Sequence, residues 1–165
     1  MPIDLQIATV DDVDEIVSLR TAASERLTST FGVGPWSGSA SSKGVLFEMR
    51  RTTAYIARDE GRLIAMLILS TRKPWAIDPA YFSKCKKPLY LTSMAVHPTM
   101  QRIGIGRRCV EEAIRIARQW PADAIRLDAY DAVAGAGEFY RKCGFREVGR
   151  VVYRNCPLIY FEMGL

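Results

Sequence analysis

The chain of 165 residues has little of what a metal centre, a disulfide framework or a membrane anchor requires. It contains one histidine, and its four cysteines, Cys85, Cys109, Cys143 and Cys156, include no C-x-x-C pair. This argues against a zinc site and favours the reducing cytoplasm over secretion. No apolar run approaches the ~20 residues needed to span a membrane. Residues 1–5 have neither the basic nor the apolar region of a signal peptide. We therefore expect a cytoplasmic protein with no metal and no membrane contact.

The charge balance is the next informative feature. Lysine and arginine exceed aspartate and glutamate by 23 to 18, which gives a net charge of +5. Such an excess indicates an anionic ligand or simply a basic surface. The basic residues are scattered and no aromatic–basic module accompanies them, so we expect no nucleic-acid partner. The rival interpretation, a basic nucleic-acid-binding domain, would require binding to DNA or RNA that depends steeply on salt. The length suits one domain over residues 1–165.

Apolar periodicity and turn residues predict an α/β protein with a mixed sheet. The hydrophobic patterns of residues 53–58 and 63–69 around Asp59–Arg62 indicate a β-hairpin in which Gly61 supplies a positive φ. The predicted strands span residues 5–8, 53–58, 63–69, 89–96, 125–129, 145–153 and 158–163. The predicted helices span residues 9–28, 45–51, about 101–120 and about 134–143, the last ended by Gly144. Residues 31–44 and 73–87 are expected to form loops.

The most informative run is Gln101-Arg102-Ile103-Gly104-Ile105-Gly106, directly after the apolar stretch of residues 91–98. It predicts a strand followed by a helix that opens with glycines. Free N–H groups and the helix dipole make a helix N-terminus a site for phosphate, and glycine lets the backbone approach the anion. Arg102, Arg107 and Arg108 add charge. We infer a pyrophosphate cradle at this junction. One rival interpretation is that the glycines merely loosen a helix start; another is a dinucleotide site, whose third glycine is replaced here by Cys109.

These residues resemble the acetyl-CoA motif of the GCN5-related N-acetyltransferases. A second motif of that family, A-x-x-x-Y-x-x-x-G-F, is matched by Ala136, Tyr140, Gly144 and Phe145. The two motifs stand in the family's order, and the resemblance covers roughly residues 3–163, with its core at about 88–145. It implies a single-domain fold with a mixed, mostly antiparallel sheet flanked by helices. The central strands of that fold splay apart and form a slot for acyl-CoA.

The resemblance also implies acetyl-CoA as co-substrate and assigns residues to it. The pantetheine arm would pair with the backbone of Met94, Ala95 and Val96. The pyrophosphate would lie on the run from Gln101 through Arg102, Ile103, Gly104, Ile105 and Gly106 to Arg107. Val133 occupies a position where many members have an asparagine that contacts the pantetheine side, and Tyr140 completes the cofactor site.

Acetyl transfer to an amine needs a proton acceptor and a proton donor for the departing thiolate. Tyr140 matches the family's helix tyrosine and is the expected donor; the alternative is a core aromatic beside Phe139. Many members carry a glutamate base early in the strand before the glycine motif, but that region here has no acidic residue. Asp128, Glu48 and a water chain to Tyr90 remain open as substitutes.

The acceptor pocket is expected from the two loops and the second helix. Phe31, Trp36, Glu48, Trp75 and Tyr81 are its candidate residues, although the aromatic ones would equally serve to pin long loops to the core. The aromatic supply favours a small or amino-acid-like primary amine, attacked directly in a ternary complex. The alternative is a catalytically weak acyl-CoA-binding or regulatory module, which the missing glutamate and Val133 keep open. Proteins of this kind commonly form homodimers, and the C-terminal strands are the expected contact.

Overall fold

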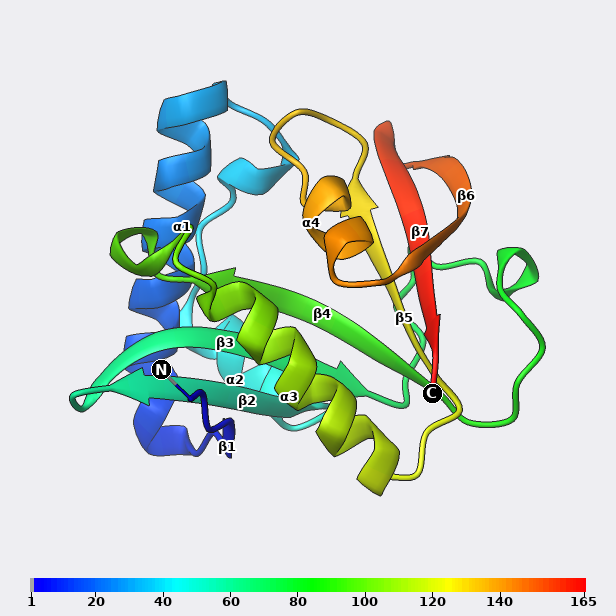
Figure 1. Ribbon diagram of the computed structural model, residues 1–165. Coiled ribbons are helices and arrows are strands. Elements are labelled where there is room, and N and C mark those ends of the chain that lie inside the picture. The colour runs from blue at the N-terminus through cyan, green and yellow to red at the C-terminus, as the bar shows by residue number, and fades with distance from the viewer. Residues whose placement is uncertain (1) are drawn as a thin grey trace. The chain divides into compact units, whose positions relative to one another are not determined.

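The computed structural model describes residues 2–165, whose strands form a seven-stranded sheet in the order β1-β2-β3-β4-β5-β7-β6 (Figure 1). This confirms the predicted mixed α+β fold flanked by helices. The contacts group into two units. The first contains the residues up to Leu69 together with Ser93–Ala113, and the second contains Ser70–Thr92 together with Ile114–Leu165. Each is described by itself below. Within residues 2–165, no helix is long and apolar enough to cross a bilayer.

The strands of the first unit pair antiparallel. They are β1 (Gln6–Ile7), β2 (Thr53–Asp59) and β3 (Arg62–Ser70). The turn between β2 and β3 has φ +47° at Glu60 and +78° at Gly61. Two consecutive positive φ values are those of the tight hairpin turns whose twist matches that of the strands. The predicted hairpin is confirmed.

Two helices of this unit start at other residues than predicted. α1 spans Val13–Phe31, because Thr9 and Asp12 cap a separate 3-10 turn before it in a reciprocal capping box. α2 spans Ser42–Met49 and begins three residues earlier than expected, because the Ser41 hydroxyl accepts the Gly44 N–H at 3.1 Å. Both differences are local capping effects that leave the order of elements unchanged.

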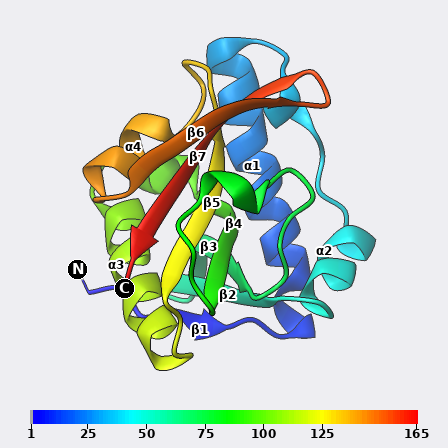
Figure 2. The same ribbon diagram turned by 90° about the vertical axis from the view of Figure 1, so that its right-hand side faces the viewer.

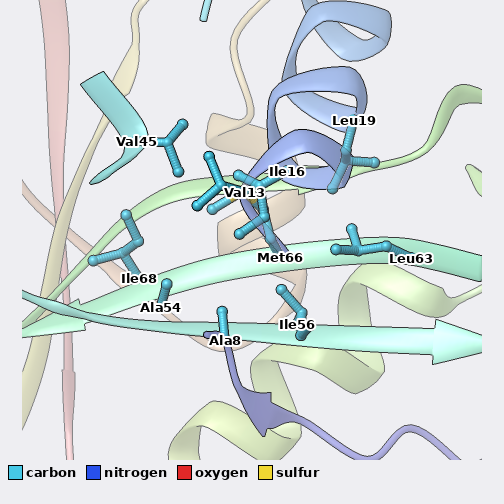
Figure 3. Packing of buried hydrophobic residues seen from close by; sticks show 10 residues of the cluster. All are labelled: Ala8, Val13, Ile16, Leu19, Val45, Ala54, Ile56, Leu63, Met66 and Ile68. Carbon is cyan, nitrogen blue, oxygen red and sulfur yellow. The ribbon is translucent and has the colours of Figure 1, made fainter. Parts of the chain in front are cut away.

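The core of the first unit lies between these helices and one face of β2 and β3. Figure 3 shows side chains from α1, α2 and alternate strand positions directed toward one another. Its buried members are Ala8, Val13, Ile16, Leu19, Val45, Ala54, Ile56, Leu63, Met66 and Ile68. The period of two in β2, the same period from Met66 to Ile68 in β3 and the helical spacing in α1 place these residues on the buried faces. Leu63 joins this face across the register shift between β2 and β3. In Figures 1 and 2, the N-terminal part of α3 (Ile105–Gln119) lies on the opposite side of β2 and β3 from α1.

The second unit contains the start of β4 (Pro88–Val96), β5 (Ala124–Tyr130), β6 (Arg146–Tyr153) and β7 (Cys156–Gly164). β4 and β5 pair in parallel over residues 88–90, whereas β5–β7 and β6–β7 pair antiparallel. The sheet is therefore mixed and mostly antiparallel, as predicted. The expected splay of the central strands stays a prediction.

The helix predicted at about 134–143 is shorter in the structure. α4 spans Gly137–Lys142, and Gly144 follows with φ +97° at the expected C-terminal position. The chain turns sharply before α4: a Cβ on Gly135 would lie 1.9 Å from the carbonyl oxygen of Tyr130. A glycine is required at this close approach, and the turn delays the helix.

A second buried cluster lies between β4, β7 and the loop of residues 71–87. Ile77 and Phe82 of the loop pack with Tyr90 and Tyr160. The Tyr160 hydroxyl donates to the Ala76 carbonyl and accepts the Asp78 N–H, so the backbone of the loop is attached to β7.

Candidate functional site

The junction between β4 and α3 is held by side chains of its own residues. The His97 N–H donates to the Ile64 carbonyl at 2.7 Å and thereby attaches the end of β4 to β3. The His97 ring caps a short turn by accepting the Thr99 N–H at 3.2 Å. The Gln101 side chain donates to the Val96 carbonyl at 3.0 Å. Gln101 therefore fixes the turn from inside, a role that the sequence did not reveal.

The residues before α3 have left-handed backbone. Within the cradle turn, which we define as Gln101–Gly104, φ is +62° at Arg102 and +88° at Gly104. A Cβ on Gly104 would meet no atom within 4 Å, so its conformation rather than its packing calls for glycine. Successive residues of unusual backbone conformation can turn their N–H groups into an anion-binding concavity.

α3 begins at Ile105, later than the predicted start at 101, and supplies the other half of the cradle. The first N–H groups of a helix have no acceptor within the helix and carry a partial positive charge. Ile105 is buried and anchors the start of the helix, whereas Ile103 is exposed. Arg107 is exposed and pairs with Glu111 at 3.3 Å, and Arg102 is also exposed. The structure thus combines open space, helix N–H groups and two exposed cations.

The strand preceding this turn contains a kink. Ser93 has φ +51° within β4, immediately before Met94, Ala95 and Val96. These three are half-buried, and Ala95 packs against the core of the first unit. The Ser93 hydroxyl lies 3.5 Å from a carboxylate oxygen of Glu48 on α2. The structure therefore brings together, within one unit, Glu48, the three strand residues and the cradle turn.

The catalytic candidates Tyr140 and Asp128 lie in the second unit. Tyr140 is buried on α4 among Phe139, Phe145 and Phe161, with ring centroids 5.1, 5.6 and 6.1 Å away. The pKa of the Tyr140 phenol is raised well above its usual value, chiefly because the group is buried away from water. Burial likewise raises the pKa of the half-buried Asp128 carboxyl. The shifts keep Tyr140 a proton donor at neutral pH and make Asp128 a stronger base than a solvated aspartate.

Two further candidates have contrasting surroundings in this unit. Tyr90 is buried, and its hydroxyl accepts a hydrogen bond from Arg126 at 3.4 Å. Val133, at 88 % exposure, stands on the loop before α4.

The acceptor candidates fall in both units. In the first, Trp36 donates from Nε1 to the Gly32 carbonyl at 3.0 Å, and its ring lies against Gly34, where a Cβ would come within 2.4 Å. Trp36 therefore folds its own loop, whereas Phe31 is exposed at the end of α1.

In the second unit, the Tyr81 ring contacts Tyr160 edge-on at 5.4 Å and occupies the space beside Gly149. Trp75 is 89 % exposed. Its loop is cross-linked by Lys73, whose Nζ donates to the Pro74 and Ile77 carbonyls at 3.0 and 2.8 Å. Of the four aromatic candidates, Trp75 is the most exposed.

A buried ion pair in the second unit was missed from the sequence. Arg126 on β5 and Glu162 on β7, each 4 % exposed, pair at 3.0 Å. Arg126 also donates to the Ser83 carbonyl at 2.6 Å, while the Ser83 N–H donates to Glu162 at 3.2 Å. The pair thus fixes the end of the loop of residues 71–87. Opposite charges inside two largely apolar strands, Arg126 in β5 and Glu162 in β7, were the signal that could have indicated it.

Comparisons with known proteins identify the family of the chain. A family model described as "Acetyltransferase (GNAT) family" matches residues 19–145. The chain belongs to the GNAT acetyltransferase family. No curated protein sequence matches the chain.

Solved structures share the GNAT fold at low sequence identity. The chain is similar to the paia N-acetyltransferase from Thermoplasma acidophilum in complex with coenzyme A, at 15 % identity, TM-score 0.73 and full coverage of both chains. It is also similar to yncA from Salmonella typhimurium with its cofactor acetyl-CoA, at 15 % identity and TM-score 0.69, covering 100 % of this chain and 95 % of that one. A ribosomal-protein-alanine N-acetyltransferase from Brucella melitensis aligns at 17 % identity and TM-score 0.74, covering 98 % and 99 %. Among residues 2–165 of this acetyltransferase-family chain, no group of three His, Cys, Asp or Glu side chains is placed to hold a metal ion.

Proposed function

We propose that the protein is one acetyltransferase domain that transfers the acetyl group of acetyl-CoA to a primary amine. The observation that carries the proposal is the cradle turn before α3, with left-handed backbone at Arg102 and Gly104. This turn provides N–H groups, open space and exposed arginines for a pyrophosphate. Membership of the GNAT family and the similarity to paia and yncA, whose structures contain coenzyme A and acetyl-CoA, support the same cofactor.

The cofactor would lie along the end of β4 and the start of α3. Backbone groups of Met94, Ala95 and Val96 would pair with the amides of the pantetheine arm, as an added strand pairs with a sheet edge. The N–H groups from Arg102 to Arg107 would hold the pyrophosphate. Gln101 would contribute indirectly, because its side chain is engaged with the Val96 carbonyl at 3.0 Å.

The chemistry would use a proton donor and a proton acceptor from this chain. As the amine nitrogen bonds to the thioester carbon and the carbon–sulfur bond breaks, the Tyr140 phenol would give its proton to the leaving sulfur. Burial raises the pKa of Tyr140 and so keeps the phenol protonated at neutral pH. The match of Tyr140 to the family's helix tyrosine, rather than this pKa, supports the role. Asp128, with its raised pKa, is the stronger base candidate of the second unit, because the Tyr90 hydroxyl is engaged with Arg126.

The acceptor would be a small-molecule amine that contacts Phe31, Trp36, Glu48, Trp75 or Tyr81. Trp75 supports a flat or apolar portion on the amine, since an exposed indole offers a large contact area and has only two rotatable side-chain bonds. In the first unit, Glu48 would offer its carboxylate to the ammonium group of the acceptor.

The test measures thiol release from acetyl-CoA in the presence of a panel of primary amines, with the acetylated product confirmed by mass spectrometry. Gly104→Glu should abolish release, because its carboxylate would compete for the helix N–H groups and repel the pyrophosphate. The matched control is Gly61→Glu: Gly61 also has positive φ, at +78°, and open space around its Cβ position, but lies in the β2–β3 hairpin. Gly61→Glu should keep thiol release. Its free energy of unfolding should fall by about as much as that of Gly104→Glu, because both changes place a side chain at a positive φ.

Three outcomes are informative. Amine-dependent release that only Gly104→Glu removes would support the proposal. Acetyl-CoA binding without release for any amine would favour the acyl-CoA-binding module instead. Equal losses in both variants would refute the assignment of the cradle turn.

A further inference from the structure

The kink in β4 lies beside Glu48 of α2, which in turn pairs with Arg20 of α1. Ser93 has φ +51°, a left-handed conformation that serine rarely adopts and that glycine, asparagine and aspartate tolerate better. Such a conformation costs free energy and persists where the surroundings hold it. A glycine would relieve the strain at Ser93 but would lack a side chain.

The hydroxyl of Ser93 is the side-chain group that holds it. It donates to Oε2 of Glu48 at 3.5 Å, near the upper limit for a hydrogen bond, and Oε1 of Glu48 accepts from Nη1 of Arg20 at 2.9 Å. An ionised carboxylate only accepts hydrogen bonds, so its two oxygens can serve the two donors at once. Arg20 and Glu48 are 28 % and 34 % exposed, which leaves the contacts partly shielded from water.

The two helices that carry Arg20 and Glu48 are themselves packed into the core of the first unit. Arg20 follows Leu19 on α1 and Glu48 follows Val45 on α2 by three residues, and Leu19 and Val45 belong to the core of the first unit. The segment after Ser93 is attached as well: Ala95 packs against this core, and the His97 N–H bonds to β3. Met94–Val96 thus lie between a fixed kink and a fixed end.

We propose that Arg20, Glu48 and Ser93 are positioning residues that preset the backbone of Met94–Val96. The φ angle of Ser93 sets the direction of the backbone N–H and C=O groups of Met94–Val96. A local kink also releases backbone groups from pairing with the neighbouring strand. The part of this inference that concerns ligand binding rests on the proposed function, because these backbone groups are those assigned to the cofactor arm. The part that concerns the backbone itself stands on the contacts alone.

The first experiment is therefore done without any ligand. Amide hydrogen exchange of the free protein is compared for native, Ser93→Gly and Glu48→Ala chains. Both variants should speed exchange in the peptide that contains residues 94–97 by about tenfold, which corresponds to ~1.4 kcal/mol of lost local stability. Ser93→Asn should keep exchange near the native rate, since asparagine tolerates the left-handed conformation and its amide can donate to Glu48.

The matched control is Glu15→Ala. Glu15 lies on the same helix as Arg20 and pairs with Arg58 at 2.8 Å, in the same unit. Its removal breaks a comparable ion pair and should leave exchange of residues 94–97 unchanged. Unchanged exchange in Ser93→Gly and Glu48→Ala, or equal acceleration in Glu15→Ala, would overturn the positioning role.

The second experiment asks whether the preset backbone matters for binding. Ser93→Gly should weaken acetyl-CoA binding about tenfold, while its melting temperature falls no further than that of Glu15→Ala, because glycine removes the strain at this φ. Unaltered affinity alongside faster exchange would separate the kink from the binding site and refute that part of the inference. Absence of acetyl-CoA binding by the native protein would refute the proposed function, while the exchange result would still decide the positioning role.

Discussion

The buried Arg126–Glu162 pair allows the sharpest stability prediction. Arg126→Met keeps much of the aliphatic stem but removes the guanidinium from Glu162, the Ser83 carbonyl and the Phe82 ring, which lies 5.0 Å from the guanidinium carbon. Glu162 would remain buried with the Ser83 N–H and a distant Arg146 at 3.7 Å. Removing one partner of a buried pair costs about 3–5 kcal/mol, because the other charge stays desolvated.

That loss translates into a large thermal shift. In a chain of this size each kcal/mol lowers the melting temperature by roughly 2–4 °C, so Arg126→Met should melt about 6–20 °C below the native protein. The control is Arg150→Met: Arg150 is 54 % exposed and pairs with Glu147 and Asp131 on the surface. Exposed pairs contribute about 0–1 kcal/mol, so this variant should melt within about 4 °C of the native protein.

Calorimetry and urea unfolding would measure both variants and the double variant Arg126→Met/Glu162→Leu. Because the double variant leaves no buried charge unpaired, it should cost less than the sum of the two single changes. The claim that the Arg126–Glu162 pair stabilises the loop of residues 71–87 would be refuted by either of two results. One is a loss of unfolding free energy in Arg126→Met no larger than that in Arg150→Met, and the other is strict additivity in the double variant.

Two further predictions concern the catalytic candidates. Tyr140→Phe should lower kcat by about 10²–10⁴-fold, the usual contribution of a positioned acid, while acetyl-CoA affinity measured by calorimetry stays within about twofold; an unchanged kcat would remove Tyr140 from the chemistry. The raised pKa of Asp128 means that the folded state binds its proton more tightly than the unfolded state, so this group's contribution to stability falls as pH rises through the interval between the two pKa values. Asp128→Asn should therefore change the melting temperature, relative to the native protein, more favourably at pH 7 than at acid pH, where the folded and unfolded states both hold the proton. An equal change at both pH values would contradict the burial of this carboxyl.

Local sequence signals predicted the fold well where short-range chemistry determines the backbone. The β2–β3 hairpin follows from a glycine between two apolar strands. The structure gives Gly61 the expected positive φ, and Glu60 before it has a positive φ as well. Gly144 ends α4 as its position predicted. A strand and a helix meet where the sequence predicted, although the helix begins only at Ile105, after the left-handed Arg102 and Gly104. Pyrophosphate binding at this junction stays a prediction.

Features that depend on distant residues were not predictable from the chain. The kink at Ser93 involves Glu48, 45 residues earlier, and the loop anchor joins Arg126 to Glu162 and Ser83. The apolar pattern of β4 contains no sign of a left-handed serine, because strand periodicity reports side-chain burial and not φ. The sequence left two roles open for Trp36, and the structure shows that its ring lies against Gly34 of its own loop.

The central claim is that the cradle turn binds the pyrophosphate of acetyl-CoA. Its most direct test is calorimetric titration of the native protein with acetyl-CoA, repeated with Gly104→Glu and Gly61→Glu. We predict micromolar binding that Gly104→Glu abolishes and Gly61→Glu retains. No binding by the native protein, or equal binding by Gly104→Glu, would contradict the claim.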